Sequence, residues 1–422
     1  MNETIKHRIE QICRGEVPKG YKKTKVGIVP EEWEEIRFNK KFSRVNRKNT
    51  EGNTNVLTIS AQYGLINQEE FFNKSVASED KSTYFLLKKG EYAYNKSYSS
   101  GYPFGALKRL ERYDSGVVSP LYICFAATSE NKCPDFYSQY FEAGKMNSEI
   151  QAFAQEGARN HGLLNISVDD FFNSVIVSPS LAEQEKIAKI LAAQDKVIAL
   201  KEKLLEEKKK QKKYLMQQLL TGKKRLPGFS GEWENVQFKD CITEIDERTI
   251  ESGQYEILSV TKNGIEKQTE HFNQQIASKD NSGYKIIKYN QLAFSILNLW
   301  MGSLGVLKSA KIGIVSPAYK VYDFTKKMLS DFGKYFLRSH NIVWLYNINS
   351  EVGASVVRKN LDLNSLMNSI IQIPSICEQE KIAQVIDFYD KELSVIQKSI
   401  DQEKQKKKAL MQLLLTGIVR TV

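Results

Sequence analysis

The sequence predicts an α+β protein built twice, with two similar mixed domains, each followed by a long α-helix, and the two helices pairing as an antiparallel coiled coil. The first observation is a ten-residue segment that begins at Pro179 and returns, almost unchanged, at Pro374. The second is a shared ending, Leu-Met-Gln-x-Leu-Leu-Thr-Gly, which closes at Gly222 and again at Gly417. Both pairs lie 195 positions apart (374 − 179 and 417 − 222), so the two helical segments align without a gap. A repeat of about half the chain indicates a duplicated body.

The first domain is predicted to span residues 1–178 and to open with a short helix over 2–14. Ile5, Ile9 and Ile12 share one face of that helix, which favours packing against the protein's own core. Runs rich in β-branched and aromatic residues predict strands, and Cys124 within one of them is interpreted as a small buried hydrophobe. The expected elements are strands at 56–59, 92–94, 116–118 and 121–125, a turn at Gly90, and a helix at 135–142.

The two helical segments, 179–222 and 373–422, each open with a predicted capping box. Ser180 with Glu183, and Ser375 with Glu378, have the spacing at which a hydroxyl and a carboxylate satisfy the free amides of a helix start. After Ser180 and Ser375 neither stretch contains Gly or Pro before Gly222 or Gly417, which are natural C-terminal stops. Each helix should therefore run for roughly 60 Å at 1.5 Å per residue.

Apolar residues at heptad spacing run along both helices and predict a coiled-coil partner, most economically the other helix of the same chain. An antiparallel pair is favoured because each helix follows its own domain. In the second helix the stripe is Ile382, Ile386, Tyr389, Leu393, Ile396 and Ile400. In the first it is broader, with Ile187, Leu191, Ile198 and Leu205 on one line and Ile190, Val197 and Leu204 beside it.

The second domain is predicted to span residues 223–372 and to repeat the first more loosely than the helices do. Glu232-Trp233-Glu234 repeats Glu32-Trp33-Glu34, whereas residues 295–301 share little with residues 95–101. A common framework with divergent loops is expected if each domain reads a different target. Its expected elements are strands at 257–260, 292–294 and 312–315, a turn at Asn290, and a helix at 328–339.

Composition limits the class of protein without assigning a function. The net charge of +11 and the pI near 9.1 favour a polyanionic partner. The lysines at 208–213 and 404–408 could equally form a solvated helix face or contact phosphates. No run of 18 apolar residues and no apolar leader is present, so a cytoplasmic protein without membrane contact is expected. The five cysteines are scattered, which favours reduced thiols over disulfides or a zinc site.

Catalytic motifs are missing from the sequence. It contains no G-x-x-x-x-G-K-[ST] phosphate loop, no G-x-G-x-x-G turn and no Asn-Pro-Pro-aromatic or Asp-Pro-Pro-aromatic motif. The four histidines, His7, His161, His271 and His340, lack metal-ligand spacing, so structural or surface roles are favoured for them. The chain is therefore predicted to be a binding protein with no catalytic or metal site of its own.

Two copies of Pro-Ser-Leu/Ile-x-Glu-Gln-Glu-Lys-Ile-Ala, each closed by Leu-Met-Gln-x-Leu-Leu-Thr-Gly, resemble the specificity subunit of type I restriction-modification enzymes. The segments Val29-Pro30-Glu31-Glu32-Trp33 and Leu226-Pro227-Gly228-Phe229 also look like that family. The resemblance covers essentially the whole chain in the order domain, helix, domain, helix.

The resemblance implies that each domain is a target-recognition domain that reads one part of a bipartite, asymmetric sequence in double-stranded DNA. It also implies that the helices set the unspecified spacer and dock two modification subunits. Two restriction subunits would join the full complex. The chain itself would be non-catalytic and bind no cofactor, because S-adenosylmethionine, ATP and Mg belong to the partner subunits.

Candidate DNA-binding residues lie in the divergent loops, where paired donors and acceptors could read base edges. Lys108, Arg109 and Lys308 are expected to clamp phosphates, which positions the protein without specifying sequence. The other candidates in the first domain are Gln62, Tyr63, Asn95, Lys96, Tyr98, Ser99, Ser100, Asn160 and His161. Those in the second are Lys262, Asn263, Asn298, Trp300, Ser303, Arg358 and Lys359.

Two alternatives remain open at the level of sequence. One is a stand-alone DNA-binding or scaffold protein that dimerises through its helices. The other is a DNA methyltransferase or nuclease with its own active site, against which the missing motifs argue.

Overall fold

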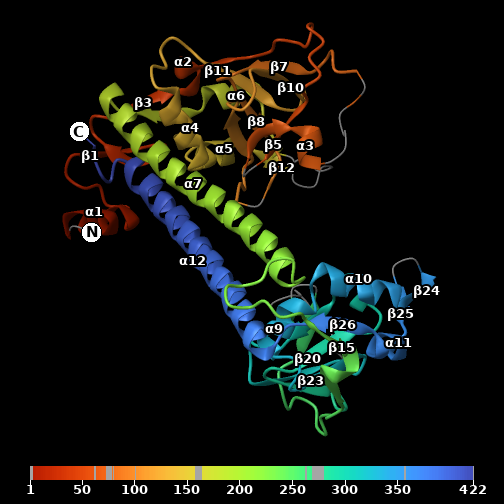
Figure 1. Cartoon of the computed structure of the whole chain (residues 1–422). Helices are drawn as coiled ribbons and strands as arrows, with labels where there is room; N and C mark the ends of the chain where they lie inside the picture. The colour runs from red at the N-terminus through yellow and green to blue at the C-terminus, as the bar shows by residue number, and fades with distance from the viewer. Residues whose placement is uncertain are drawn as a thin grey trace. The chain divides into compact units, whose positions relative to one another are not determined.

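The computed structural model describes residues 3–60, 63–72, 78, 80–99, 101–156, 164–261, 264–268, 280–355 and 358–421, and its contacts divide the chain into two units. Unit 1 comprises Met1–Lys201 and Ser399–Val422, and unit 2 comprises Glu202–Lys398. The long helices α7 (Leu181–Leu219) and α12 (Ile376–Leu414) each contribute one part to each unit (Figure 1). The units group residues that contact one another, so each long helix is divided between them. The predicted domains instead divide the chain into consecutive segments.

Unit 1 is built around a four-stranded antiparallel sheet in the order β4-β11-β8-β9. These strands are Phe42–Arg44, Ile123–Ala127, Tyr92–Asn95 and Ala106–Arg109. Antiparallel two-stranded ribbons surround it: β1 (Tyr21–Thr24) with β2 (Gly27–Pro30), β3 (Glu34–Arg37) with β14 (Val175–Ser178), β5 (Leu57–Ser60) with β6 (Gly64–Asn67), β7 (Phe85–Lys88) with β10 (Ser115–Val118), and β12 (Gln155–Glu156) with β13 (Leu164–Asn165). Its short helices are α1 (Glu3–Cys13), α2 (Phe38–Lys41), α3 (Gln68–Phe72), α4 (Pro134–Glu142), α5 (Asn147–Phe153) and α6 (Val168–Asn173).

Unit 2 repeats this topology, which confirms the predicted duplication of an α+β body. Its sheet has the order β16-β23-β20-β21, with strands Ile242–Ile245, Tyr319–Phe324, Leu292–Ser295 and Leu304–Val306. Its ribbons are β15 (Glu234–Gln237) with β26 (Ile370–Ile373), β17 (Leu258–Thr261) with β18 (Gly264–Lys267), β19 (Lys285–Lys288) with β22 (Ile312–Val315), and β24 (Ser350–Ser355) with β25 (Arg358–Leu361). Its short helices are η1 (Phe238–Asp240), η2 (Leu299–Met301), α9 (Ser330–Phe336), α10 (His340–Ile348) and α11 (Leu363–Asn368).

Each of the predicted strands corresponds to an observed one within about two residues. The turns at Gly90 and Asn290 are also confirmed, with φ values of 89° and 73°. One strand begins later than predicted, at Ile123, because the exposed Leu121 and its neighbour Tyr122 form a turn closed by the Tyr122 amide on the Ser119 carbonyl (3.1 Å). The helix predicted at 328–339 is shorter, since α9 stops at Phe336.

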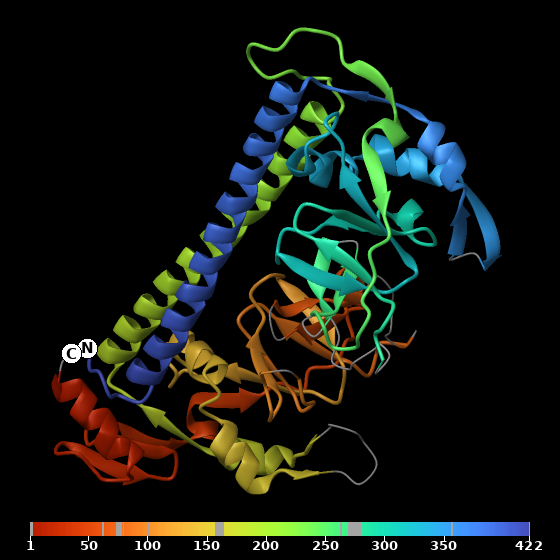
Figure 2. The same ribbon diagram turned by 90° about the horizontal axis from the view of Figure 1, so that it is seen from below.

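The long helices run antiparallel within each unit, as predicted (Figures 1 and 2). In unit 1 the Lys407 ammonium lies 2.6 Å from the Asp195 carboxylate, and Lys201 donates to Glu403 at 2.8 Å. In unit 2 the Lys208 ammonium lies 2.6 Å from the Glu392 carboxylate. As the residue numbers rise along α7, the numbers of their partners on α12 fall, so the two helices run in opposite directions.

The apolar stripes anchor both helices in the domain cores. Ile187, Leu191 and Met411 join the core of unit 1, whose centre is a cluster of aromatic rings around Phe38 and Phe125. Ile382 and Ile386 join the core of unit 2. Along α7 the second apolar line, Ile190, Val197 and Leu204, is exposed and takes no part in either core.

The predicted capping boxes are half right. The Ser180 and Ser375 hydroxyls accept from the backbone amides of Glu183 (3.3 Å) and Glu378 (3.4 Å). The two carboxylates, expected to cap the same helix starts, are instead buried and bind arginines. Glu378 accepts two hydrogen bonds from the Arg225 guanidinium, at 2.6 and 2.5 Å.

Glu183 makes the equivalent contact with a residue from the far end of the chain. It accepts from Arg420 at 2.8 and 3.1 Å and from the Trp33 indole at 3.0 Å. The tail of residues 415–421 is held further by the Tyr21 hydroxyl, which donates to the Gly417 carbonyl at 2.7 Å. Both ends of the described chain thus lie in unit 1 (Figure 2).

The N-terminal helix α1 forms where predicted but without the expected role. None of its residues is buried, and Ile5, Ile9 and Ile12 are only half-buried. It is tethered by Arg8, which lies over the Tyr21 ring at 5.1 Å and donates to the Ile418 carbonyl. Core packing was therefore the wrong prediction for this helix.

Candidate nucleic-acid interface

The loop after the central strand β8 carries several candidates of the first domain. The Asn95 side chain accepts from the backbone amide of Ser97 at 3.1 Å, which turns the chain away from the strand. Ser99 pairs with Tyr102 in a short bridge, and the Tyr98 ring between these turns is 64% exposed. An exposed aromatic ring with neighbouring amides and hydroxyls can stack on a base and hydrogen-bond its edge.

Lys96 in this loop lies beside the β12–β13 hairpin, because the Leu164 amide donates to the Lys96 carbonyl at 3.0 Å. Burial lowers the pKa of Lys96. No carboxylate of the described residues pairs with its ammonium group. The turn of this hairpin, with the candidates Asn160 and His161, lies outside the described residues, as does Ser100.

In unit 2 the equivalent loop and hairpin also meet, which brings together candidates more than 50 positions apart. The loop forms η2 directly after Asn298, whose backbone carbonyl accepts from the Ser303 amide at 3.4 Å. The Lys359 ammonium lies 5.1 Å from the centroid of the Trp300 ring and donates to the Asn347 side chain at 2.6 Å. A lysine over an indole face is a cation–π pair, and the buried Trp300 indole N–H has no partner among the described residues.

The three expected phosphate clamps are already paired with carboxylates. Lys108 binds Glu142 and donates to the Tyr102 hydroxyl at 3.0 Å. Arg109 binds Asp135, and Lys308 binds Asp331 while donating to Asn290 at 2.6 Å. Each links the sheet to the start or end of α4 or to the start of α9, so a DNA phosphate would have to displace a carboxylate.

The turns between β5 and β6 and between β17 and β18 are described in part. Tyr63 is exposed, and its amide donates to the Ser60 hydroxyl at 3.2 Å. Gln62, Lys262 and Asn263 lie outside the described residues, and Arg358 is the first residue of β25.

Sequence reasoning missed Arg338, which follows α9. Its guanidinium donates to the Leu304 carbonyl at 3.1 and 2.5 Å and to the Thr261 carbonyl at 3.5 Å. Burial lowers its pKa. The residue joins the end of β17 to strand β21, and no sequence signal marks these contacts because the Leu304 and Thr261 groups that it binds are backbone carbonyls.

Within the described ranges no group of three or more His, Cys, Asp or Glu side chains could hold a metal ion. The same part of the chain contains no helix long and apolar enough to cross a bilayer. The two loop-and-hairpin pairs offer the exposed Tyr98 ring together with half-buried amide, indole and basic groups.

Comparison with known proteins places this architecture in a class. No family model matches the chain. It is 26% identical over 309 residues to the type I restriction enzyme MjaVIII specificity subunit of Methanocaldococcus jannaschii, which spans 64% of this chain and 68% of the relative. It also shares its fold with a chain in a structure described as the basis of complex assembly and conformational transition of the type I R-M system. That match has a TM-score of 0.57 and 13% identity, and covers 93% of this chain and 99% of the other.

The fold defines a class of proteins in which two similar α+β domains are carried on a pair of long antiparallel helices. The chain shares this fold with the chain from the type I R-M structure, and its sequence is similar to that of the archaeal specificity subunit.

Proposed function

We propose that this chain directs a type I complex to a bipartite, asymmetric DNA sequence, one part of which is read by each unit. The observation that carries the proposal is the repeat itself. The two units share one strand order, yet the loops at the ends of β8 and β20 differ in sequence and conformation. A shared framework with different loops is suited to recognising two different half-sites.

The chemistry of the two loops supports different base preferences. The first offers Asn95, Lys96 and Tyr98, whereas the second offers Asn298 and a tryptophan covered by Lys359. Asn reads adenine through paired contacts and Lys reads guanine acceptors, so different arrangements favour different sequences.

The helices are proposed to set the gap between the half-sites. Each comprises 39 residues, or roughly 58 Å at 1.5 Å per residue. That length is comparable to one to two turns of B-DNA at about 34–36 Å each.

The exposed line of Ile190, Val197 and Leu204 on α7 supports a docking role for the same helices. Apolar residues that recur every seven positions without an internal partner are suited to a partner helix. We propose two modification subunits as the partners, with two restriction subunits in the full complex. Methylation, translocation and cleavage, with S-adenosylmethionine, ATP and Mg, would reside in those subunits.

The test is to sequence the methylome of cells that carry this chain together with its modification subunit, against cells that lack only this chain. A chain-dependent methyladenine motif in two parts with a fixed gap is expected. If the complex assembles and no new motif appears, the proposal fails and a scaffold that binds DNA without directing methylation becomes the better account.

A further inference from the structure

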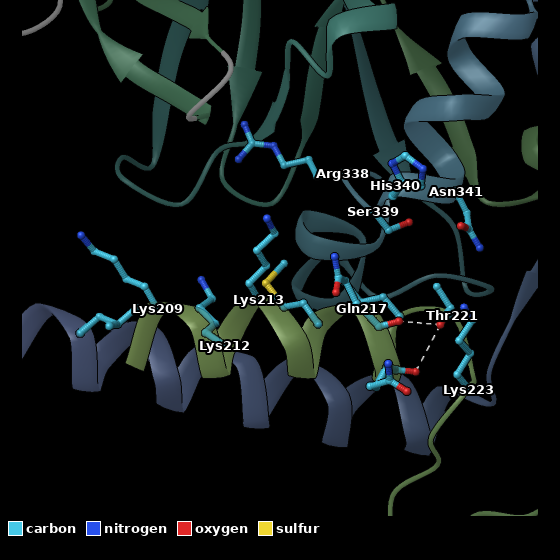
Figure 3. Close-up of a pocket in the computed structure, with 14 residues that line it drawn as sticks. Lys209, Lys212, Lys213, Gln217, Thr221, Lys223, Arg338, Ser339, His340 and Asn341 are labelled. Atoms are coloured by element: carbon cyan, nitrogen blue, oxygen red, sulfur yellow. Dashed lines mark hydrogen bonds between the residues drawn. The ribbon is translucent and has the colours of Figure 1, made fainter. Parts of the chain in front are cut away.

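A cavity of about 650 Å³ lies inside unit 2, between the last turns of α7 and the start of α10 (Figure 3). Its described lining contains no Asp or Glu. On the α7 side it is lined by Lys209, Lys212 and Lys213, and on the opposite side by Arg338 and His340. A concave surface with several cations and no carboxylate is an electrostatic site for an anion.

The N-terminus of α10 adds neutral donors to this cavity. Ser339, the residue before the helix, is 8% exposed, and its hydroxyl has no hydrogen-bond partner among the described residues. It lines the cavity with His340 and Asn341, the first two residues of α10 (Figure 3). Free amides at a helix start attract anions, and a buried hydroxyl without a partner is costly unless a ligand satisfies it.

Unit 1 contains the corresponding cavity, of about 450 Å³. Its α12 side is lined by Lys404, Lys407 and Lys408, which lie 195 positions after Lys209, Lys212 and Lys213. The remaining cation is Lys145, and the lone lining carboxylate, Glu142, is bound by Lys108. The same basic cavity thus occurs twice, once in each unit.

Some of the lysines that line the two cavities form ion pairs with carboxylates, and others do not. Lys212 binds Asp390, Lys407 binds Asp195 and Lys209 binds Glu206. Lys213 and Lys408 are exposed at the rims, and the described residues provide no carboxylate for either.

Lys145 is likewise without a carboxylate partner in the described part of unit 1, and burial lowers its pKa. A half-buried ammonium group with no counter-ion favours the arrival of an anion.

Each cavity adjoins the candidate base-reading elements of its own unit. The lining in unit 1 includes Gly101, Tyr102 and Gly105, which belong to the loop after β8. In unit 2 Arg338 links the cavity to the end of β17 through the Thr261 carbonyl. An anion in either cavity would therefore lie next to a nucleic acid held by those loops.

We propose that the two cavities, here called the helix-root pockets, bind backbone phosphates of the duplex adjacent to the half-site read by the same unit. This rests on the proposed function and adds to it a second contact, independent of base sequence. Lys213 on α7 and Lys408 on α12 neutralise phosphates, and Ser339 with the α10 amides donates to their oxygens in unit 2. Phosphate contacts fix the position of a protein on DNA and carry no direct sequence information.

The test uses the complete chain assembled with its modification subunits, and duplexes with and without the target found by methylome sequencing. Apparent affinity is measured across a series of salt concentrations. The K213Q/K408Q double variant should lower the slope of log affinity against log salt by about 1.8, from roughly 0.9 per lost phosphate contact. Affinity should fall equally on specific and non-specific DNA, with both half-sites unchanged.

The matched control is K210Q, which removes an α7 lysine that pairs with Glu207 and does not line the pocket. Its slope should stay close to that of the unmodified complex. S339A is the second variant, because it removes a donor without changing charge and should weaken DNA binding through unit 2.

An unchanged slope for K213Q/K408Q, together with unchanged affinity for S339A, would overturn the inference while leaving the methylation motif intact. Loss of subunit assembly in the absence of DNA would also overturn it, because the pockets would then serve an acidic surface of a partner protein. Absence of any methylation motif in the unmodified complex would count against the proposed function itself.

Discussion

At the scale of single residues, Glu183 and Glu378 have the same unusual role in the two units. Each is a buried carboxylate at the start of a long helix, and each is held by an arginine that follows the end of the other helix. Hydrogen bonding to Glu183, with a further contribution from Glu32, raises the pKa of Arg420, so the guanidinium stays charged. The two arginines, Arg225 and Arg420, lie 195 positions apart like the helices.

Replacing Arg420 with alanine should strongly destabilise unit 1. Among the described residues the substitution leaves the buried Glu183 carboxylate with the Trp33 indole and the Thr421 amide as donors. Removing one partner of a buried pair costs about 3–5 kcal/mol. Urea unfolding followed by hydrogen exchange in each unit would measure it. Lys210→Ala is the control, because its pair with Glu207 is exposed and should contribute little. Equal effects of the two variants would contradict the buried-pair argument.

Thiol reactivity should separate the cysteines into two groups. Cys13 and Cys377 are exposed, whereas Cys124, Cys133 and Cys241 are buried. Burial raises the pKa of Cys124 and of Cys241 to about 12. At pH 8 a disulfide reagent should therefore titrate two thiols in the folded protein and five in denaturant. A third fast thiol in the folded state would contradict this assignment.

The raised pKa values of Cys124 and Cys241 also predict how the stability of the protein changes with pH. A raised thiol pKa means that the folded protein holds the proton more tightly than the unfolded chain. The contribution is fully present below the ordinary value of 9.0 and is lost as the pH rises toward about 12. The free energy of unfolding should therefore fall across that alkaline range.

The sequence could predict which residue types lie in the candidate loops, but not which of them contact residues that are distant in the chain. Trp300 and Lys359 were both proposed from sequence, but their contact depends on a hairpin returning to η2. Lys108 and Lys308 looked available because their partners Glu142 and Asp331 lie 34 and 23 positions further on. A sequence shows that a residue is a lysine, but it does not show that a carboxylate distant in the chain pairs with that lysine in the folded protein.

At the scale of elements, long periodic segments were predicted accurately and short ribbons were not. The ends of α7 and α12 fall three residues before the predicted stops, Gly222 and Gly417, because caps, glycines and a sustained heptad stripe agree. The strand β3 was missed, since its four residues pair with β14 about 140 positions away. The two-residue strands of the β12–β13 hairpin give no periodic signal at all.

Inserting one heptad into both long helices should lengthen the gap of the DNA target without changing either half-site. The insertions belong after Lys201 on α7 and before Ser399 on α12, which are hydrogen-bonded at 2.7 Å. The ion pairs of each unit, Lys407–Asp195 and Lys208–Glu392, then keep their own register. Seven residues add roughly 10 Å of helix, or about three base pairs at 3.4 Å each.

Methylome sequencing of the lengthened variant would provide the measurement. A heptad in α7 alone is the control, because it shifts the paired faces of one helix past the other and should impair folding. A gap that stays the same in the doubly lengthened protein would show that the helices do not set it.

At the scale of the whole molecule, the two repeats should be exchangeable separately. If the proposed function holds, replacing residues 34–178 with the same region of a type I specificity subunit should alter one half of the recognised sequence and leave the gap and the other half unchanged. This boundary retains Tyr21, Glu32 and Trp33, which hold the tail and Glu183. Methylome sequencing checks the outcome, and changes in both halves would contradict independent reading.

The tail contacts also govern the order in which the protein can be completed on the ribosome. Unit 2 is one continuous stretch, Glu202–Lys398, so all of its residues are available before synthesis ends. When residue 398 has been synthesised, unit 1 still lacks its α12 segment and Arg420. Glu183 therefore does not yet have the guanidinium that binds it in the complete protein. Domains made first usually fold first. In this protein most of unit 1 is translated before unit 2, but unit 1 can complete its fold only after unit 2 has been synthesised.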